Sequence, residues 1–274
     1  MIKQFSNILN WIIFSNFFVA FCVLSLTISS EVLLGTVNLR ISQFVFFATL
    51  LTYNFQRIVK LKQRQKQLKT DWQAKNKIST YFIMVISAII ILYYFYYFKS
   101  STQIAIIFSG ILSLLYSFRI RNIPFAKIFV IALVWTISTM LLLVLENNML
   151  INQNLILHLS ARFLFVFAIT IPFDIRDLKF DDKKMKTIPI VFGERKAKLI
   201  GVMALFFCDL IAIVQILYFD MEFHNLIALI CIFFLAAILI IKSSQCKTAI
   251  YFSFWVESLS IYFYLFLILS TLLL

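Results

Sequence analysis

Long apolar segments recur along the whole chain, and they constrain the fold more than any other feature of the sequence. Most of them reach the length of about 17–25 residues that an α-helix needs to cross the hydrocarbon core of a bilayer. Hydrophobic residues make up 62% of the chain and charged residues only 14%, which excludes an ordinary soluble domain. The sequence therefore predicts an all-α, polytopic membrane helix bundle in which residues 1–274 form a single transmembrane domain.

Polar or charged stretches separate these segments into nine predicted transmembrane helices. The second segment is short as it stands, and we expect it to continue into Asn54 and Arg57. The nine predicted spans are Trp11–Ser29, Ile41–Tyr53, Ser79–Phe98, Thr102–Phe118, Phe125–Leu145, Leu155–Phe173, Ala197–Phe219, Phe223–Ile241 and Ile250–Leu273.

The basic residues are distributed unevenly between the loops, and this asymmetry predicts the orientation. If the N-terminus is inside, the N-terminus and the loops after spans two, four, six and eight carry 22 of the 25 Lys and Arg residues. Cytoplasmic loops of membrane proteins carry such an excess. We therefore expect a protein of the cytoplasmic (inner) membrane whose C-terminus lies outside. The net charge of +13 indicates attraction to anionic membrane lipids, and nucleic acid is not an expected partner because the cations lie in short loops.

An acidic stretch, DIRDLKFD at residues 174–181, begins where the sixth span stops. If the helix continues past Phe173, Asp177 and Asp181 are four residues apart on one face, and Asp174 lies one turn earlier. Clustered carboxylates repel one another unless a cation neutralises them. Mg²⁺ takes one or two carboxylates and completes its shell with water and phosphate oxygens. The stretch therefore predicts a site for Mg²⁺ and a diphosphate at the membrane surface.

Purely structural roles for the ionisable residues remain open as alternatives to a magnesium and diphosphate site. The acids at residues 174–181 are also compatible with a helix end that neighbouring Arg and Lys residues balance. Inside the spans, Arg162 is expected to form a structural ion pair with Glu257 or Asp209, since an ionisable residue in a membrane is costly unless it is paired.

The loop after the fourth span, LYSFRIRNIPFAK at residues 115–127, adds a Tyr, a Ser and three cations on the same side of the membrane. Arg and Lys neutralise phosphate charge, and apolar helices offer a slot for a hydrocarbon tail. The predicted ligand is an amphiphile with a diphosphate head and an isoprenoid tail. The chemistry that fits it is ionisation of a carbon–oxygen bond, with cations stabilising the departing diphosphate.

These segments, together with KTIPIVFG at residues 186–193, resemble the UbiA superfamily of intramembrane prenyltransferases. The resemblance implies a Mg²⁺-dependent enzyme that transfers an isoprenoid from a prenyl diphosphate to a lipophilic or aromatic acceptor. It also implies that Asp177 and Asp181 are the catalytic metal ligands, with Asp174 in support. The residues it places on the diphosphate side are Asn54, Arg57, Tyr116, Arg119, Arg121, Lys127 and Lys186.

The chain departs from the family in its first acidic motif, which has the form N-D-x-x-D-x-x-x-D after the second span. Asn54 is present here, but Phe55, Ile58 and Lys62 stand at the positions of the acids. One hypothesis, which we favour, is an altered enzyme in which nearby cations such as Arg57 replace one metal ion. The other is a non-catalytic protein that binds or transports a prenyl lipid on the same scaffold.

Overall fold

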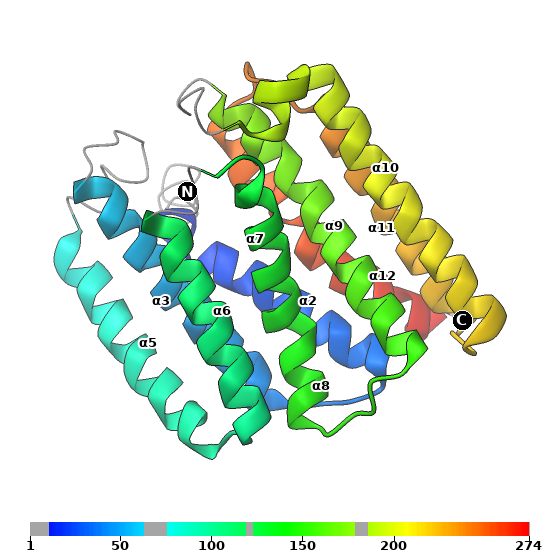
Figure 1. The fold of residues 1–274 in the computed structure, drawn as a ribbon, viewed down its shortest axis with the longest axis horizontal. Helices are drawn as coiled ribbons and strands as arrows, with labels where there is room; N and C mark the ends of the chain where they lie inside the picture. Colours follow the sequence, from blue (N-terminus) through cyan, green and yellow to red (C-terminus); the bar gives the residue numbers. More distant parts are fainter. Residues whose placement is uncertain (1–10, 63–75, 119–122, 179–185, 274) are drawn as a thin grey trace, which may run out of the picture.

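A computed structural model describes residues 11–62, 76–118, 123–178 and 186–273, and this part of the chain is helical with short connections (Figure 1). Seven helices are long and apolar enough to cross a membrane, and α3 and α6 are two further helices in the bundle. The predicted all-α membrane bundle is confirmed, and the helices of the described ranges correspond one to one to the nine predicted spans. Their bounds are α2 Phe17–Leu34, α3 Leu39–Lys62, α5 Lys77–Tyr97, α6 Ser100–Phe118, α7 Ala126–Thr136 with α8 Leu142–Glu146, α9 Gln153–Asp177, α10 Ile188–Tyr218, α11 Phe223–Lys242 and α12 Leu259–Leu273.

Two of the spans contain a wider π-helical turn. The turn η2, Ile137–Leu141, joins α7 to α8, and the turn η4, Tyr251–Val256, begins the last span. Such turns interrupt the regular hydrogen-bonding ladder of an α-helix and occur often at functional sites. Both border features described below, because Met140 of η2 lines a cavity and Glu257 follows η4 directly.

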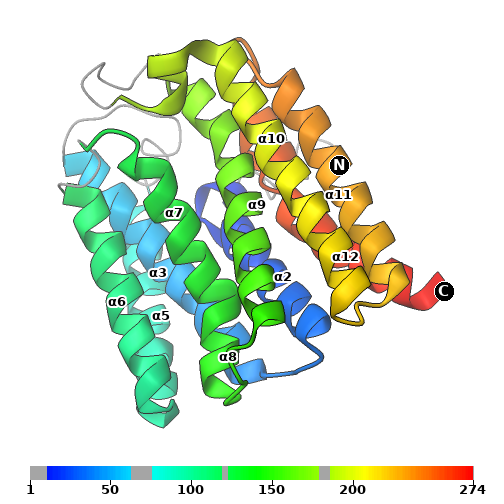
Figure 2. The same cartoon turned by 45° about the vertical axis from the view of Figure 1, so that its right-hand side comes forward.

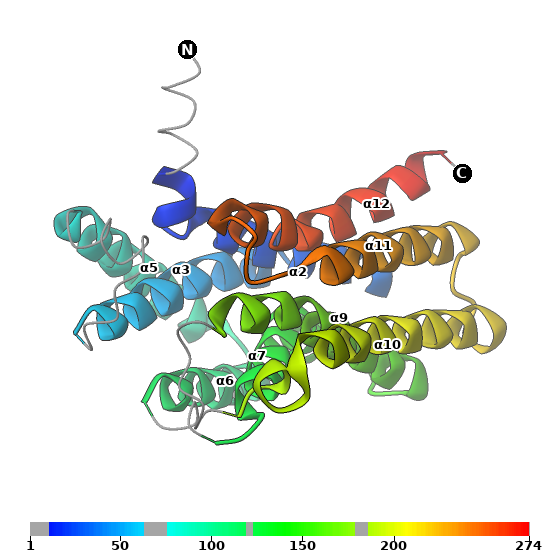
Figure 3. The same cartoon turned by 90° about the horizontal axis from the view of Figure 1, so that it is seen from above.

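The helices form two rows when the bundle is seen from above (Figure 3). One row holds α6, α7, α9 and α10, and the other holds α5, α3, α2, α12 and α11. Helix α9 lies between α7 and α10 in its row (Figure 2) and also packs against α11 and η4 of the opposite row. This central position brings the acids at the end of α9 close to side chains from both rows.

The chain reverses direction so that α3, α6, α9 and α11 end where α5, α7, α10 and η4 begin, at the top of Figure 1. We call this the charged end, because the described residues Lys77, Lys127, Arg176 and Lys242 lie there. Arg40 and Lys99 lie at the opposite end of the bundle. The described basic residues that the sequence assigned to one side of the membrane therefore lie at one end of the bundle, and Arg40 and Lys99 lie at the other.

A large buried core joins α9 to α10, α11 and α12. Its centre is a group of three aromatic rings, in which Phe165 lies 5.0 Å from Phe263 and 5.8 Å from Phe233 between ring centroids. A smaller core joins α2 and α3 to η2 and α8 through residues such as Phe44 and Leu143. Buried aromatic pairs at these separations contribute about 0.5–1.5 kcal/mol beyond the burial of their area.

The ends of several helices differ from the predicted spans. Helix α3 runs to Lys62, which confirms the expected extension of the second span through Asn54 and Arg57. The seventh span begins earlier than predicted, at Ile188, because Pro189 is suited to the first turn of a helix. The helix is kinked at Gly193, whose φ of 80° favours a residue without a Cβ. Beyond this kink, α10 continues to Tyr218. The segment KTIPIVFG is thus a short helical turn and a kink, where the sequence indicated a loop.

Gly201 of α10 sits where three helices approach closely, and a larger residue there is expected to destabilise the bundle. A Cβ at this position would lie 3.1 Å from Ile171 Cδ1 of α9 and 3.3 Å from Ile240 Cγ2 of α11. Overpacking of this kind costs about 1–3 kcal/mol, so Gly201→Val should lower the thermal unfolding midpoint in detergent. Gly110→Val is the matched control, because nothing lies within 4 Å of a Cβ at Gly110. Equal midpoints for the two variants would contradict the close packing.

Candidate functional site

Helix α9 carries its acids to the charged end of the bundle. The helix passes through the buried Pro172 and ends at Asp177, so it continues beyond the predicted end of the sixth span at Phe173. Asp174 is 1% exposed, whereas Asp177 is partly exposed. Asp181 lies outside the described residues, and its position on the same helical face as Asp177 stays a prediction.

Lys127, in the first turn of α7, lies between the two described acids of α9. Its Nζ is 2.7 Å from Asp174 Oδ1 and 3.5 Å from Asp177 Oδ2. The side chains of Lys127 and Asp174 are both almost fully buried, at 8% and 1% exposure. Sequence analysis assigned Lys127 to the diphosphate, and the structure instead brings its ammonium group onto the carboxylates that were predicted to bind metal.

Arg176 donates two hydrogen bonds to the carboxylate of Asp177. Its Nε donates to Asp177 Oδ1 over 2.8 Å, and its Nη2 donates to Asp177 Oδ2 over 3.2 Å. The guanidinium also lies over the ring of Phe173, at 5.2 Å, and over that of Phe252, at 5.8 Å. A planar guanidinium that is bound to a carboxylate and stacked on aromatic rings has little freedom to move. Asp177 is therefore held in one orientation between Arg176 and Lys127.

Arg57 of α3 reaches the same cluster from the opposite row of helices. It interacts electrostatically with Glu257, and Glu257 also interacts with Arg176. The Nη1 atom of Arg57 is buried and has no hydrogen-bond partner in the part of the chain that the structure describes. A buried guanidinium nitrogen without an acceptor is costly, because it has lost its hydration. Arg57 thus retains a hydrogen-bond donor that an anion at the charged end would satisfy.

Asn54, the surviving residue of the first acidic motif, makes hydrogen bonds within the protein. Its Nδ2 donates to the carbonyl of Leu50 over 2.9 Å and to that of Ser15 over 3.3 Å, and its Oδ1 accepts from Asn16 Nδ2 over 2.9 Å. The side chain is 1% exposed. These bonds connect α3 to the segment that precedes α2, which gives Asn54 a structural role in addition to the diphosphate role that was predicted for it.

The loops after the fourth and sixth spans lie beside each other at the charged end. The backbone N–H of Phe125 donates to the carbonyl of Lys186 over 3.3 Å, and the rings of Phe125 and Phe192 stack with centroids 6.0 Å apart. The two sequence motifs are therefore neighbours in space. The side chain of Lys186 is exposed. Arg119, Arg121 and the side chain of Tyr116 lie outside the described residues, so their predicted roles stay predictions.

Sequence analysis missed two members of this cluster, Arg176 and Glu257. Arg176 was treated only as one of the basic residues that balance the acids at residues 174–181. Glu257 was one of two acids expected to pair with Arg162, and this prediction is wrong, because Arg162 donates to Ser29 and Ser30. The signal for Glu257 was present, since an acid within an apolar segment requires a partner, but only the packing of η4 against α9 shows that the partners are Arg57 and Arg176.

In a comparison with protein families, residues 73–259 match the model of the UbiA prenyltransferase family. The chain belongs to this family. The matched range includes α6, α7, α9 and α10, and so includes both acids of α9 and Lys127. No curated protein sequence matches the chain.

Solved UbiA structures share the fold over almost the entire chain. The apo structure of a UbiA homolog from Aeropyrum pernix K1 has a TM-score of 0.67 and 10% identity, and the match covers 93% of this chain and 97% of that one. A UbiA homolog from Archaeoglobus fulgidus, bound to GPP and Mg²⁺, has a TM-score of 0.64 and 13% identity, with 95% and 98% covered. A digeranylgeranylglyceryl phosphate synthase has a TM-score of 0.59 and 14% identity, with 93% and 94% covered. These likenesses establish the UbiA fold.

Two carboxylates lie at the place where the sequence predicted a magnesium site. Among them, no group of three or more His, Cys, Asp or Glu side chains is arranged to hold a metal ion. Asp174 and Asp177 provide two carboxylates, of which Asp177 is the more exposed. Because Mg²⁺ in phosphate-binding sites uses one or two carboxylates together with substrate oxygens, this donor set fits a single Mg²⁺ that is shared with a diphosphate.

Proposed function

We propose that this protein transfers an isoprenoid group from a prenyl diphosphate to a lipophilic or aromatic acceptor. Family membership supports a membrane prenyltransferase. We further propose that residues 1–274 act as one transmembrane domain of the cytoplasmic membrane, with the charged end facing the cytoplasm, where water-soluble diphosphate is released. The excess of cations at that end supports this orientation.

One observation carries the proposal: cations and carboxylates from both rows of helices meet at the charged end of an apolar bundle. Lys127 and Arg176 contact Asp177, and Arg57 joins them through Glu257. A diphosphate needs several positive charges within one small region, and a prenyl chain needs an apolar environment beside it. The core formed by α9, α10, α11 and α12 lies directly below the cluster.

In the proposed reaction, the bond between the first carbon of the prenyl chain and its diphosphate oxygen breaks, and both electrons leave with the diphosphate. An electron pair of the acceptor forms the new bond to that carbon, and the acceptor loses a proton. Arg57 and Arg176 would stabilise the charge that develops on the leaving oxygens, since fixed cations in a dry site act strongly on such charge. Phe173 and Phe252, which flank Arg176, would shield the allylic cation from water.

We propose Asp177, with Asp181 and with Asp174 in support, as the residues that would hold Mg²⁺. The ion would supply further neutralisation of the diphosphate charge. Lys127 competes for the same carboxylates, because its Nζ lies on the side where both acids converge. Tyr116, Arg119, Arg121 and Lys186 remain proposed contacts of the diphosphate.

A second candidate function is binding or transport of a prenyl lipid without catalysis. One observation favours it: Phe55 and Ile58 replace two acids of the first motif, and Asn54 is engaged in hydrogen bonds within the protein. The two functions differ in whether Mg²⁺ causes the diphosphate to leave.

That difference can be measured with purified protein in liposomes that contain extracted membrane lipids as the source of acceptor. A prenyltransferase should release diphosphate from added GPP, and release should depend on Mg²⁺ and on the lipid extract. A binding protein should retain GPP without release, and this result would replace the enzymatic proposal by the second candidate. Liposomes without protein provide the blank.

Arg57→Gln should weaken binding of GPP by about 10- to 100-fold, because one charge-assisted hydrogen bond contributes about 1.5–3 kcal/mol. Equilibrium binding of labelled GPP measures the effect. Arg40→Gln is the matched control, since Arg40 is an exposed arginine at the opposite end of the same helix. If the two variants bind GPP equally well, Arg57 does not contact the diphosphate.

A further inference from the structure

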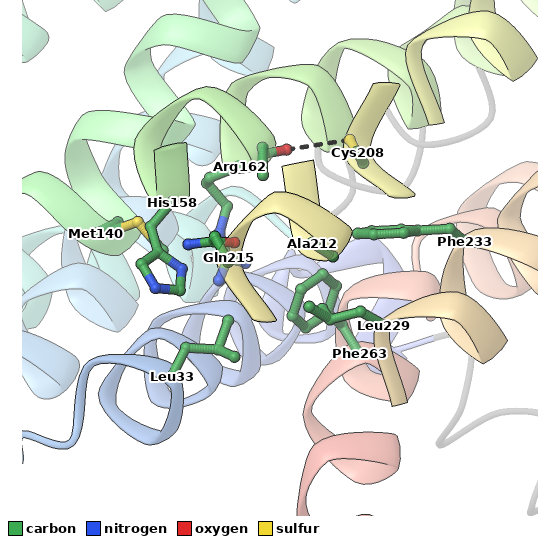
Figure 4. Close-up of a pocket in the computed structure, with 11 residues that line it drawn as sticks. Leu33, Met140, His158, Arg162, Cys208, Ala212, Gln215, Leu229, Phe233 and Phe263 are labelled. Carbon is green, nitrogen blue, oxygen red and sulfur yellow. Dashed lines mark hydrogen bonds between the residues drawn. The ribbon is translucent and has the colours of Figure 1, made fainter. Parts of the chain in front are cut away.

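A small cavity lies inside the bundle, away from the charged end, where α2, α9, α10, α11 and α12 meet (Figure 4). Its polar lining comes from His158 and Arg162 of α9 and from Cys208 and Gln215 of α10, and its apolar lining includes Leu229 and Phe263. Arg162 is about 22 Å from Asp177 along α9, as given by the rise per residue of a helix. The cavity is therefore separate from the candidate prenyl diphosphate site.

The guanidinium of Arg162 is buried in this cavity and only partly satisfied. The residue is 2% exposed, and its side chain extends from α9 toward the cavity on the same side as His158 and Gln215 (Figure 4). Its Nη2 donates to Ser29 Oγ over 3.1 Å and to Ser30 Oγ over 2.9 Å. Its Nη1 is buried and has no hydrogen-bond partner among residues 11–62, 76–118, 123–178 and 186–273.

The positive charge of Arg162 also lacks a carboxylate partner in the described part of the chain. The expected ion pair with Glu257 or Asp209 is not formed, because Glu257 lies with Arg57 and Arg176 and the partners of Arg162 are serine hydroxyls. Its other close contact is the ring of Phe263, whose centroid is 4.7 Å from Arg162 Cζ. An arginine at the centre of a membrane helix costs at least about 2.5–3.5 kcal/mol, so a compensating negative charge is favoured strongly.

Gln215 and Cys208, which also line the cavity, make hydrogen bonds within the protein. Gln215 Nε2 donates to Asn154 Oδ1 over 2.8 Å, and Cys208 Sγ donates to the carbonyl of Ala161 over 3.4 Å. Ser29 and Ser30 accept hydrogen bonds from Arg162, and both donate their own hydroxyl protons to the carbonyl of Leu26. The distance to that carbonyl is 2.7 Å from Ser29 Oγ and 3.2 Å from Ser30 Oγ. The donor Arg162 Nη1 therefore stays unsatisfied beside a full positive charge.

The size of the cavity restricts what can occupy it. It has room for about one water-sized particle, which excludes a prenyl diphosphate, an aromatic acceptor and a lipid head group. We propose that the cavity binds a single monovalent anion of halide size, such as chloride, held by Arg162 Nη1. The anion makes the buried site neutral and accepts the hydrogen bond that the protein leaves unmade. This proposal does not depend on the proposed prenyl transfer.

Thermal unfolding in detergent tests the proposal, with chloride replaced by gluconate at constant ionic strength. Gluconate is too large for the cavity. For the wild-type protein, each tenfold increase in chloride above its dissociation constant should raise the unfolding midpoint by about 3–5 °C. Arg162→Gln should abolish this increase, whereas Arg40→Gln should retain it, because Arg40 is exposed at the surface. Equal midpoints of the wild-type protein in chloride and gluconate would overturn the proposal.

Crystals grown in bromide provide a test that does not require a variant to fold. A bromide ion should give an anomalous difference peak within hydrogen-bond distance of Arg162 Nη1. A water molecule at that position, without an anomalous peak, would show that the cavity is hydrated and does not select an anion.

Discussion

Lys127→Met should destabilise the protein by about 3–5 kcal/mol, because it removes the cation of a buried pair and leaves the partner carboxylate in place. Lys127 Nζ lies 2.7 Å from Asp174 Oδ1, and both side chains are almost fully buried. The unfolding midpoint in detergent measures the loss. Lys198→Met is the matched control, since it breaks a partly exposed pair with Glu194 of 2.8 Å and should cost no more than about 1 kcal/mol.

The double variant Lys127→Met, Asp174→Leu separates the buried charge from other effects of the substitution. Replacement of an entire buried ion pair by apolar residues is often neutral, so the double variant should recover most of the stability that the single variant loses. If Lys127→Met unfolds at the same temperature as Lys198→Met, the contact with Asp174 does not stabilise the fold.

Lys127→Met should also bind Mg²⁺ more readily than the wild-type protein. In the wild-type protein, the ammonium group of Lys127 occupies the side on which Asp174 and Asp177 converge. Its removal leaves two carboxylates near each other without that cation, and a divalent ion then compensates both. Added Mg²⁺ should therefore raise the midpoint of the variant more than that of the wild-type protein. Equal increases would indicate that the metal does not compete with Lys127.

Asp177→Asn should reduce the rate of diphosphate release from GPP by about 100- to 1,000-fold. The reason is that loss of one charge-stabilising group in a preorganised site has effects of this size. The substitution preserves the shape of the side chain, and Asp177 is partly exposed. The unfolding midpoint should therefore change little, while the rate of diphosphate release falls steeply. Asp220→Asn is the control, because Asp220 is exposed at the opposite end of the bundle.

The comparison of binding with turnover in the Asp177→Asn variant distinguishes the two candidate functions. For an enzyme, GPP binding should weaken only moderately while release falls steeply, because Mg²⁺ acts mainly on the departing charge. A variant that releases diphosphate as fast as the wild-type protein would remove Asp177 from the reaction.

Sequence alone predicted the helical framework of this protein correctly. The length of each apolar segment is a local property of the sequence, and it indicates whether a helix can cross a bilayer. The charges of the loops are also local, and they indicate which loops share one side of the membrane. The continuation of α3 through Arg57 was expected from the same local pattern. The two motif loops were predicted to meet at one membrane face, and the bond between Phe125 and Lys186 joins them there.

The partners of the charged side chains were decided only by the tertiary structure. Lys127 was expected beside a diphosphate and lies on Asp174, Glu257 was expected beside Arg162 and lies with Arg57 and Arg176, and Arg162 faces a cavity. These outcomes depend on how far each helix is rotated and shifted against its neighbours, and a difference of one residue turns a side chain by about 100° around the helix axis. Packing of large side chains such as Phe165 and Phe263 sets those rotations across segments about 100 residues apart, which no local pattern in the sequence encodes.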